Sequence, residues 1–137
     1  MAKQRKKWVF APPKLPKPTV PEDVKQEVEA QANALVESVL KVRHISPPPD
    51  NTEFNYIVDI DTKWHRGYFY FVAVYCSPGP HAIAPTFDTK FARMEYAGDR
   101  SFHLSYMRHT GKWFEIYRDL SLDECLKAIS EHPAFFP

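Results

Sequence analysis

Residues 68–76, Tyr-Phe-Tyr-Phe-Val-Ala-Val-Tyr-Cys, form an uncharged run that is rich in aromatic and β-branched side chains. A strand with one solvated face alternates apolar and polar residues, so an unbroken apolar run predicts a strand that is buried on both faces. Gly67 and Pro78 bound the run, and the segments on either side alternate as strands do. We therefore expect residues 68–76 to be the central strand around which the rest of the chain is arranged.

The composition predicts a reduced, cytoplasmic, single-domain protein. A chain of 137 residues can bury a hydrophobic core that needs no disulfide bond or metal ion to stabilise it. Its two cysteines have neither the spacing of a disulfide framework nor that of a metal site. The six histidines are scattered without a metal-binding pair, so we expect no metal and no cofactor. The sequence shows neither a signal peptide nor an apolar run of membrane-spanning length, so we expect no membrane contact.

The first 18 residues are expected to form an extended, proline-rich arm, separate from a domain over residues 19–137. They carry six basic residues and no acidic one, which leaves −5 on residues 19–137 because the net charge of the chain is +1. Four prolines favour a polyproline-like backbone. This charge asymmetry predicts that the arm meets an anion, which is nucleic acid, a partner or the acidic body of the protein. The predicted contact residues of the arm are Lys3, Arg5, Lys6, Lys7, Trp8 and Phe10.

Two amphipathic helices are predicted to flank the strands. Thr19 and Glu22 have the spacing of a capping box, and apolar residues recur with helical periodicity over residues 24–40. A long N-terminal helix should therefore begin near Thr19. Ser121 and Glu124 predict a second capping box at the start of a shorter C-terminal helix.

Between the helices the sequence predicts five strands, which gives the order α-β-β-β-β-β-α. Four short connections favour a five-stranded antiparallel meander with both helices on one face, which is an α+β fold. In the third strand the apolar phase slips from odd positions, such as Phe91, to even ones, such as Met94. This slip predicts a β-bulge near Ala92.

The assignment of the sheet faces decides where a partner would bind. We expect the helices to cover the face of Tyr70 and Leu104, which leaves an apolar stripe edged with polar groups on the other face. An exposed stripe of this kind marks an interaction site, so the arm, a second subunit or a ligand should cover it. The residues of this predicted ligand or partner face are Phe69, Phe71, Tyr75, Asp59 and His103.

A second predicted site lies at one end of the sheet. Alternate turns of a meander share an end, so the loop over residues 77–85 should lie beside the turn over residues 108–112. The anion or small-ligand site expected there consists of His81, Arg108, His109 and Lys112. The two basic and aromatic segments 63–66 and 108–113 fall at opposite ends and should not build one groove. This placement argues against a platform for single-stranded nucleic acid, which needs a continuous basic track.

The leading interpretation is a non-catalytic binding protein that acts through its basic arm and one aromatic sheet face. The possible nucleophile Cys76 has no sequence spacing that links it to a base, and no catalytic residue is predicted. The expected partner is another protein or a second copy of the chain. One alternative is a nucleic-acid or ribonucleoprotein-associated protein that uses the arm. The other is a small-ligand-binding or enzymatic domain with a cleft on the second sheet face.

Overall fold

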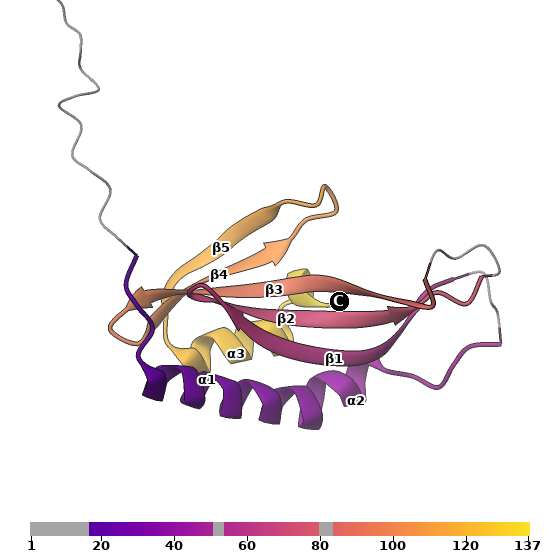
Figure 1. Cartoon of the computed structure of the whole chain (residues 1–137), viewed down its shortest axis with the longest axis horizontal. Coiled ribbons are helices and arrows are strands. Elements are labelled where there is room, and N and C mark those ends of the chain that lie inside the picture. The colour runs from indigo at the N-terminus through magenta and orange to yellow at the C-terminus, as the bar shows by residue number, and fades with distance from the viewer. Residues whose placement is uncertain (1–16, 51–53, 80–83) are drawn as a thin grey trace, which may run out of the picture.

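The computed structural model describes residues 17–50, 54–79 and 84–137 (Figure 1). Its strands lie in one sheet in the order β1-β2-β3-β4-β5, and each neighbouring pair is antiparallel. The predicted meander is therefore confirmed, and the apolar run over residues 68–76 is an interior strand, although it is the second of the five and not the central one. The strands are β1 (Tyr56–His65), β2 (Tyr68–Cys76), β3 (Thr86–Gly98), β4 (Ser101–Met107) and β5 (Trp113–Leu120).

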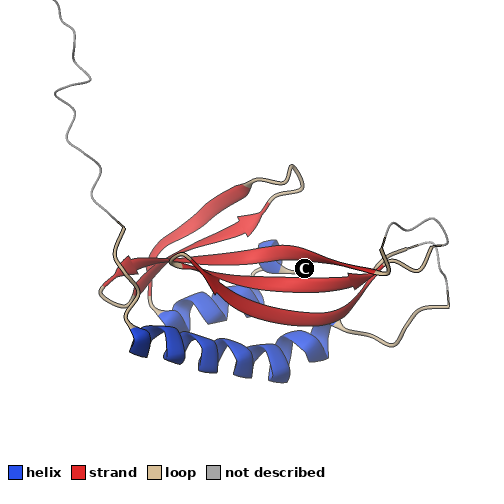
Figure 2. Ribbon diagram, viewed as in Figure 1, coloured by secondary structure: helices blue, strands red, loops and turns tan. Residues whose placement is uncertain are grey.

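Helices cover one side of this sheet, and among the described residues no helix lies on the other side, which we call the open face (Figure 2). The first helical segment runs without a break through α1 (Glu22–Leu35), the π-helical turn η2 (Val36–Leu40) and α2 (Lys41–His44). The second consists of α3 (Leu122–Glu131), and a 3-10 turn, η3 (Pro133–Phe135), follows it. The α+β architecture is as predicted. In the described ranges, none of these helices combines the length and apolarity that a bilayer crossing requires.

The two helical segments begin in different ways. α3 has the predicted capping box, in which the Glu124 amide donates to Ser121 Oγ at 3.1 Å and the Ser121 amide donates to the Glu124 carboxylate at 2.8 Å. The box predicted at Thr19 is wrong, because α1 has Pro21 as its N-cap and no side-chain cap. Glu22 is thus the first helical residue rather than the third, and a capping box needs the acid at the third position.

The hydrophobic core lies between the sheet and the helices. Phe69 and Phe71 of β2 are 0% exposed and share this core with Val24, Val28 and Ala32 of α1. The predicted assignment of faces is therefore wrong for β2, because the helices cover the side of Phe69 and Phe71, and it is right for Leu104, which shares this core. These two residues are core residues and form no open ligand or partner face.

The error arises from the phase of β2, which is apolar on both faces and so does not indicate which face meets the helices. Met94 of β3 lies opposite Phe69 on one side and opposite Leu104 on the other. Directly opposite residues in antiparallel strands point to the same face, so Leu104 shares the face of Phe69. The open face carries Tyr68 and Tyr70 instead.

β3 changes its surroundings at a bulge. Phe71 of β2 pairs with Ala92, and the next residue of β2, Val72, pairs with Lys90. Phe91 is therefore an extra residue between these two pairs, which defines a β-bulge. The bulge predicted near Ala92 is confirmed. β3 pairs with β2 along its length from Thr86 to Glu95, but it pairs with β4 only from Ala92 to Gly98. This difference creates the site described next.

Candidate functional site

The sheet forks at the bulge of β3. β4 ends at Met107, and a turn closed by a 2.9 Å hydrogen bond from the Arg108 amide to the Lys112 carbonyl leads into β5. Residues 86–90 of β3 consequently have no strand on their β4 side within the part of the chain that the structure describes. We call residues 86–90 the free half-edge. Figure 1 shows the hairpin of β4 and β5 lifting away from β3 towards its tip.

A cleft lies between the free half-edge and this hairpin. It consists of two adjoining cavities of about 380 and 400 Å³, which share Thr89, Lys90, Met107 and Gly111. One cavity lies on the helix side and the other on the open side of the sheet. Each has the size of an ordinary ligand site, about 300–1,000 Å³. The lining residues of this fork cleft are Lys63, Val72, Ala73, Tyr75, Asp88, Thr89, Lys90, Phe91, Met107, Arg108, His109, Gly111, Phe136 and Pro137.

The fork cleft is predominantly cationic. Lys63, Lys90 and Arg108 line it, and Asp88 is the only acidic side chain among the described lining residues. Among the described residues, none of these three cations forms a salt bridge. The Lys90 ammonium lies 4.7 Å from the ring centre of Tyr70, and the Arg108 guanidinium lies 4.8 Å from that of Phe114. Cation–π contacts orient these groups without neutralising their charge.

Arg93 links the hairpin to the rest of the sheet. Its guanidinium lies 4.6 Å from the ring centre of Tyr68 and 4.8 Å from that of Trp113. Tyr68 is the first residue of β2 and Trp113 the first residue of β5, so this contact crosses the open face between strands that do not pair. The stack therefore helps to set the position of the hairpin over the cleft.

The C-terminal tail bounds the cleft on the helix side. Phe135 is buried in the core, and Phe136 lines the cleft. The Phe136 ring centre lies 5.2 Å from that of His44 and 5.8 Å from the Arg43 guanidinium. Burial lowers the pKa of His44, and the neighbouring charge of Arg43 lowers it further. Arg43 also donates a hydrogen bond to the Ser130 carbonyl, so α2 holds both α3 and the tail.

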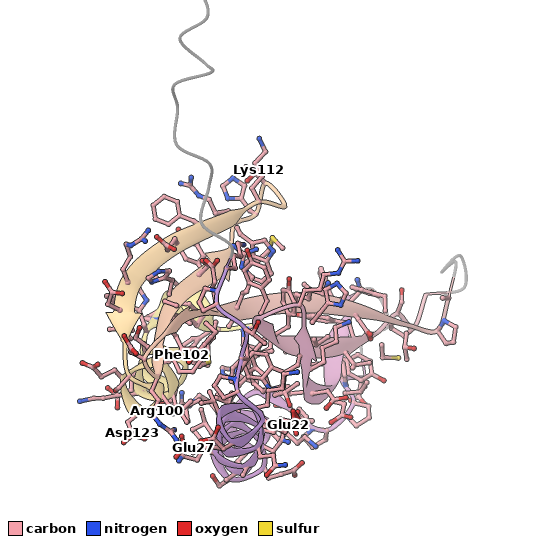
Figure 3. The ribbon with its side chains drawn as sticks, turned by 60° about the vertical axis from the view of Figure 1, so that its left-hand side comes forward. Glu22, Glu27, Arg100, Phe102, Lys112 and Asp123 are labelled. Carbon is pink, nitrogen blue, oxygen red and sulfur yellow. The ribbon has the colours of Figure 1, made fainter. Side chains whose placement is uncertain are left out.

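Two of the four residues predicted for an anion site lie in the fork cleft. Arg108 and His109 line the cleft, as placed at this end of the sheet from sequence. Lys112 extends from the tip of the hairpin, away from Glu22 and Arg100 at the opposite end of the molecule (Figure 3). His81 lies outside the described residues.

The residues of the predicted partner face are dispersed. Tyr75 lines the fork cleft and stacks on Phe87 with ring centres 5.3 Å apart, and burial raises its pKa. Asp59 is exposed at the sheet edge and pairs with Lys41 at 3.0 Å. His103 accepts a hydrogen bond from the Asp119 amide at 3.2 Å. With Phe69 and Phe71 in the core, these five side chains form no common surface.

The arm is described only from Lys17 onward. The Lys17 ammonium pairs with Glu95 at 3.1 Å and lies 4.6 Å from the ring centre of Tyr68, so the arm joins the domain on the open face. The predicted arm contacts lie outside the described residues; they are Lys3, Arg5, Lys6, Lys7, Trp8 and Phe10.

The expectation that segments 63–66 and 108–113 share no groove is wrong. Lys63 of the first segment and Gly111 of the second line the same cavity. The ring of Trp113 also lies 5.9 Å from that of Tyr70, the residue paired with Lys63. The turns over residues 65–67 and 108–112 do lie at opposite ends of the sheet. The hairpin of β4 and β5, however, lies over the open face, and its tip approaches Lys63 of β1.

Sequence reasoning missed the central part of the site, which is Lys90, Lys63, Met107 and the free half-edge. The signal that was present in the sequence is the phase slip around Phe91, because a bulge is where a strand bends and pairing ends. The second signal is the length of the strands, since β3 has 13 residues and β4 only 7. A long strand beside a short one leaves an unpaired stretch.

Another cavity, of about 340 Å³, lies between α1 and α3 and is lined by Arg100. The Arg100 guanidinium bonds to Glu27 at 2.6 Å and to Asp23 at 3.1 Å, so its charge is already satisfied. Figure 3 shows Arg100 beside Glu27 and Asp123. The fork cleft therefore has the stronger basis for recognising an anion.

Neither of the two cysteines, Cys76 and Cys125, lines the fork cleft. Cys125 is buried in the core, and burial raises its pKa to about 12, which keeps it a neutral thiol near pH 7. In residues 17–50, 54–79 and 84–137, no group of three metal-binding side chains comes together. The fork cleft offers cations, apolar side chains and unpaired backbone, which are groups that recognise a ligand.

The comparison with protein families identifies one match. The family model described as Domain of unknown function (DUF3024) matches residues 19–137. No curated protein and no solved structure matches the chain. Because the family match spans most of the chain, the protein belongs to the DUF3024 family.

Proposed function

We propose that this member of the DUF3024 family is a non-catalytic binding protein that holds an anionic segment of a partner in the fork cleft. The proposal rests on Lys63, Lys90 and Arg108, which surround the cleft without a carboxylate partner among the described residues. Cations that are gathered around a concave site focus the electrostatic field and raise the local concentration of an anion. The side chains of a ligand would find apolar contacts beside these charges at Met107 and Phe136.

The charge of the basic arm supports the same function. Its six positive charges lie in residues 1–18, and Lys17 joins it to the open face, onto which one half of the cleft opens. Charges act on one another over about a Debye length, which is about 8 Å at physiological salt. We propose that the arm accelerates the encounter with the partner, whereas the cleft provides the local fit.

Nucleic acid is the second candidate partner, and the charge of the arm favours it. Affinity for a phosphate backbone falls steeply with salt, because binding releases counterions. The net charge of −5 on residues 19–137 opposes this candidate, since it repels a long polyanion that extends beyond the cleft. A protein partner with a short acidic segment avoids this repulsion. A second copy of the chain, the alternative protein partner named from the sequence, also has acidic residues to offer, because its residues 19–137 carry a net negative charge.

Fluorescence anisotropy with labelled poly-glutamate tests the proposal on the full chain. Lys90→Glu and Arg108→Glu each replace an attraction with a repulsion inside the cleft, so each should weaken binding by about tenfold. Deletion of residues 1–16 should slow association and reduce the salt dependence, while a measurable affinity persists. Circular dichroism checks that each variant is folded, which we expect because both side chains are exposed.

Lys127→Glu is the matched control. It makes the same change of charge at an exposed position of α3, outside the fork cleft, and should bind as the wild type does. Equal weakening by Lys90→Glu and Lys127→Glu would show that only the total charge matters and would refute the proposal. Binding that survives both cleft variants and disappears with the arm would instead favour the nucleic-acid candidate.

A further inference from the structure

We infer that the anionic segment is an extended acidic peptide that adds to the free half-edge of β3 as a short strand, an inference that rests on the function proposed above. An open strand edge presents a row of unpaired N–H and C=O groups, which is a template for another strand. Several peptide-binding domains use this geometry, with main-chain hydrogen bonds for affinity and side-chain pockets for specificity. The free half-edge is such an edge, and a cleft of ligand size lies directly beside it.

The position that the peptide would take is already defined by β4. Beside residues 92–98 of β3, β4 occupies the next place in the sheet, and it ends at Met107. The same place beside residues 86–90 is the fork cleft. Neighbouring strands lie about 4.8 Å apart, so a peptide in this place contacts β3 on one side and the hairpin on the other. It would continue the line of β4 along the remaining length of β3.

The two cavities of the cleft predict the sequence pattern of the peptide. Successive side chains of a strand point to opposite faces of the sheet. On the open face the peptide would meet Lys63 and Lys90, which favour acidic residues. On the helix side it would meet Phe91 and Phe136, which favour apolar ones. The peptide should therefore alternate acidic and apolar residues.

Charge and hydrogen bonding select this occupant over two others. The arm of the chain itself carries only positive charges, so Lys63, Lys90 and Arg108 repel it. A nucleic acid satisfies the cations through its phosphates, but phosphate oxygens only accept hydrogen bonds. Alternate residues of the free half-edge offer both N–H donors and C=O acceptors along one line, and the backbone of a peptide strand is complementary to both.

The test uses the full chain and a short labelled peptide that alternates glutamate and valine. Two further peptides of the same sequence carry N-methyl groups, one on the glutamates and the other on the valines. In a strand added to an edge, only alternate N–H groups point to the neighbouring strand. One methylated peptide should therefore bind about tenfold more weakly than the parent, and the other should bind equally well. Amide hydrogen exchange of residues 86–90 should slow when the parent peptide binds.

The other results overturn the inference in separable ways. If both methylated peptides bind like the parent, charge alone holds the ligand, and strand addition is wrong while the proposed function stands. If single-stranded RNA of equal charge binds more tightly and displaces the peptide, the partner class is wrong. If neither the peptide nor poly-glutamate binds, the proposed function itself is wrong. Lys127→Glu serves again as the control for non-specific charge.

Discussion

The two halves of β3 have the same backbone conformation and different surroundings. In residues 92–98, Ala92, Met94 and Tyr96 are buried, and the strand pairs with β4 throughout and with β2 as far as Glu95. In residues 86–90 every side chain is exposed, and within the described part of the chain the strand pairs with β2 alone. The extra residue Phe91 divides them. A single bulge thus converts one strand from a core element into an edge.

This contrast shows how a small domain obtains a binding edge without losing its core. The buried half anchors the strand, so the exposed half keeps its extended form without a second neighbour. An open edge is also an aggregation hazard, and native proteins protect such edges with charged side chains. Asp88 and Lys90 lie on the free half-edge. Lys90 can therefore protect the edge from wrong partners and select an acidic one.

The largest expected effect separates the two halves by stability. Met94→Ala removes a fully buried side chain and should cost about 2–5 kcal/mol of the free energy of unfolding. Phe87→Ala, on the same face of the same strand, removes a side chain that is 40% exposed and stacked on Tyr75. This change should cost about 1 kcal/mol. Urea denaturation measures both values, and equal losses would contradict the division of β3 into a buried and an exposed half.

The sequence was sufficient for the order of the elements and for the bulge. Turn residues and alternation mark the strands, and the capping box of Ser121 marks the start of α3. The phase slip near Ala92 marks the bulge, because in this strand the apolar and polar residues alternate clearly on both sides of it. These features depend on residues that are close together in the chain, and local chemistry determines them.

The sequence was not sufficient for the faces of β2 or for the fork. β2 is apolar on both faces, so its alternation contains no information about which face meets the helices. Packing against α1 decides this, and the packing is not local. The fork was missed because it depends on how far β4 extends beside β3. Arg108 and His109 were predicted for an anion site, but Lys63 and Lys90 join them only through the curvature of the sheet.

A smaller effect is expected where the hairpin is tied to the rest of the sheet. Arg93→Ala removes cation–π contacts with both Tyr68 and Trp113 and should cost about 1–2 kcal/mol. Because the hairpin forms one wall of the cleft, the same variant should also weaken the binding of an acidic peptide. Arg93→Lys keeps a positive charge near the two rings, so it should lose less stability and less peptide affinity than Arg93→Ala. An Arg93→Ala variant with unchanged stability would show that the stack does not hold the hairpin.

A loss of stability on the helix side should leave the cleft unaffected. Ser121→Ala removes the Oγ acceptor of the Glu124 amide and should cost about 1 kcal/mol. Ser121 does not line the cleft, so peptide affinity should match that of the wild type. Chemical denaturation and anisotropy on the same preparation check both statements. A parallel loss of affinity would mean that the binding edge and the core are more strongly coupled than the two halves of β3 suggest.

The smallest expected effect is a dependence of stability and of peptide affinity on pH, which the protonation of His44 should cause. Burial and Arg43 lower the pKa of His44 below its usual 6.5 in the folded protein, so the unfolded chain binds the proton more readily. Stability should therefore be greatest above pH 6.5 and decrease as the pH falls from 6.5 through the lowered pKa of the folded state. His44→Phe keeps a ring against Phe136 and should reduce this decrease, whereas His65→Gln, at an exposed position, should retain it.

The same proton should influence the ligand, because Phe136 packs on His44 and lines the fork cleft. A charged imidazole is more stable in water than against the Phe136 ring. Protonation of His44 should therefore weaken its contact with Phe136, which forms the helix side of the cleft. Peptide affinity in the wild type should then decrease relative to that in His44→Phe over the same pH range, and His109, which also lines the cleft, is present in both proteins and cancels in this comparison. Glutamates of the peptide have an ordinary pKa near 4.3 and stay charged above pH 6, so they do not produce this change. An identical pH profile of affinity in both proteins would show that the buried and the exposed regions respond to protons independently.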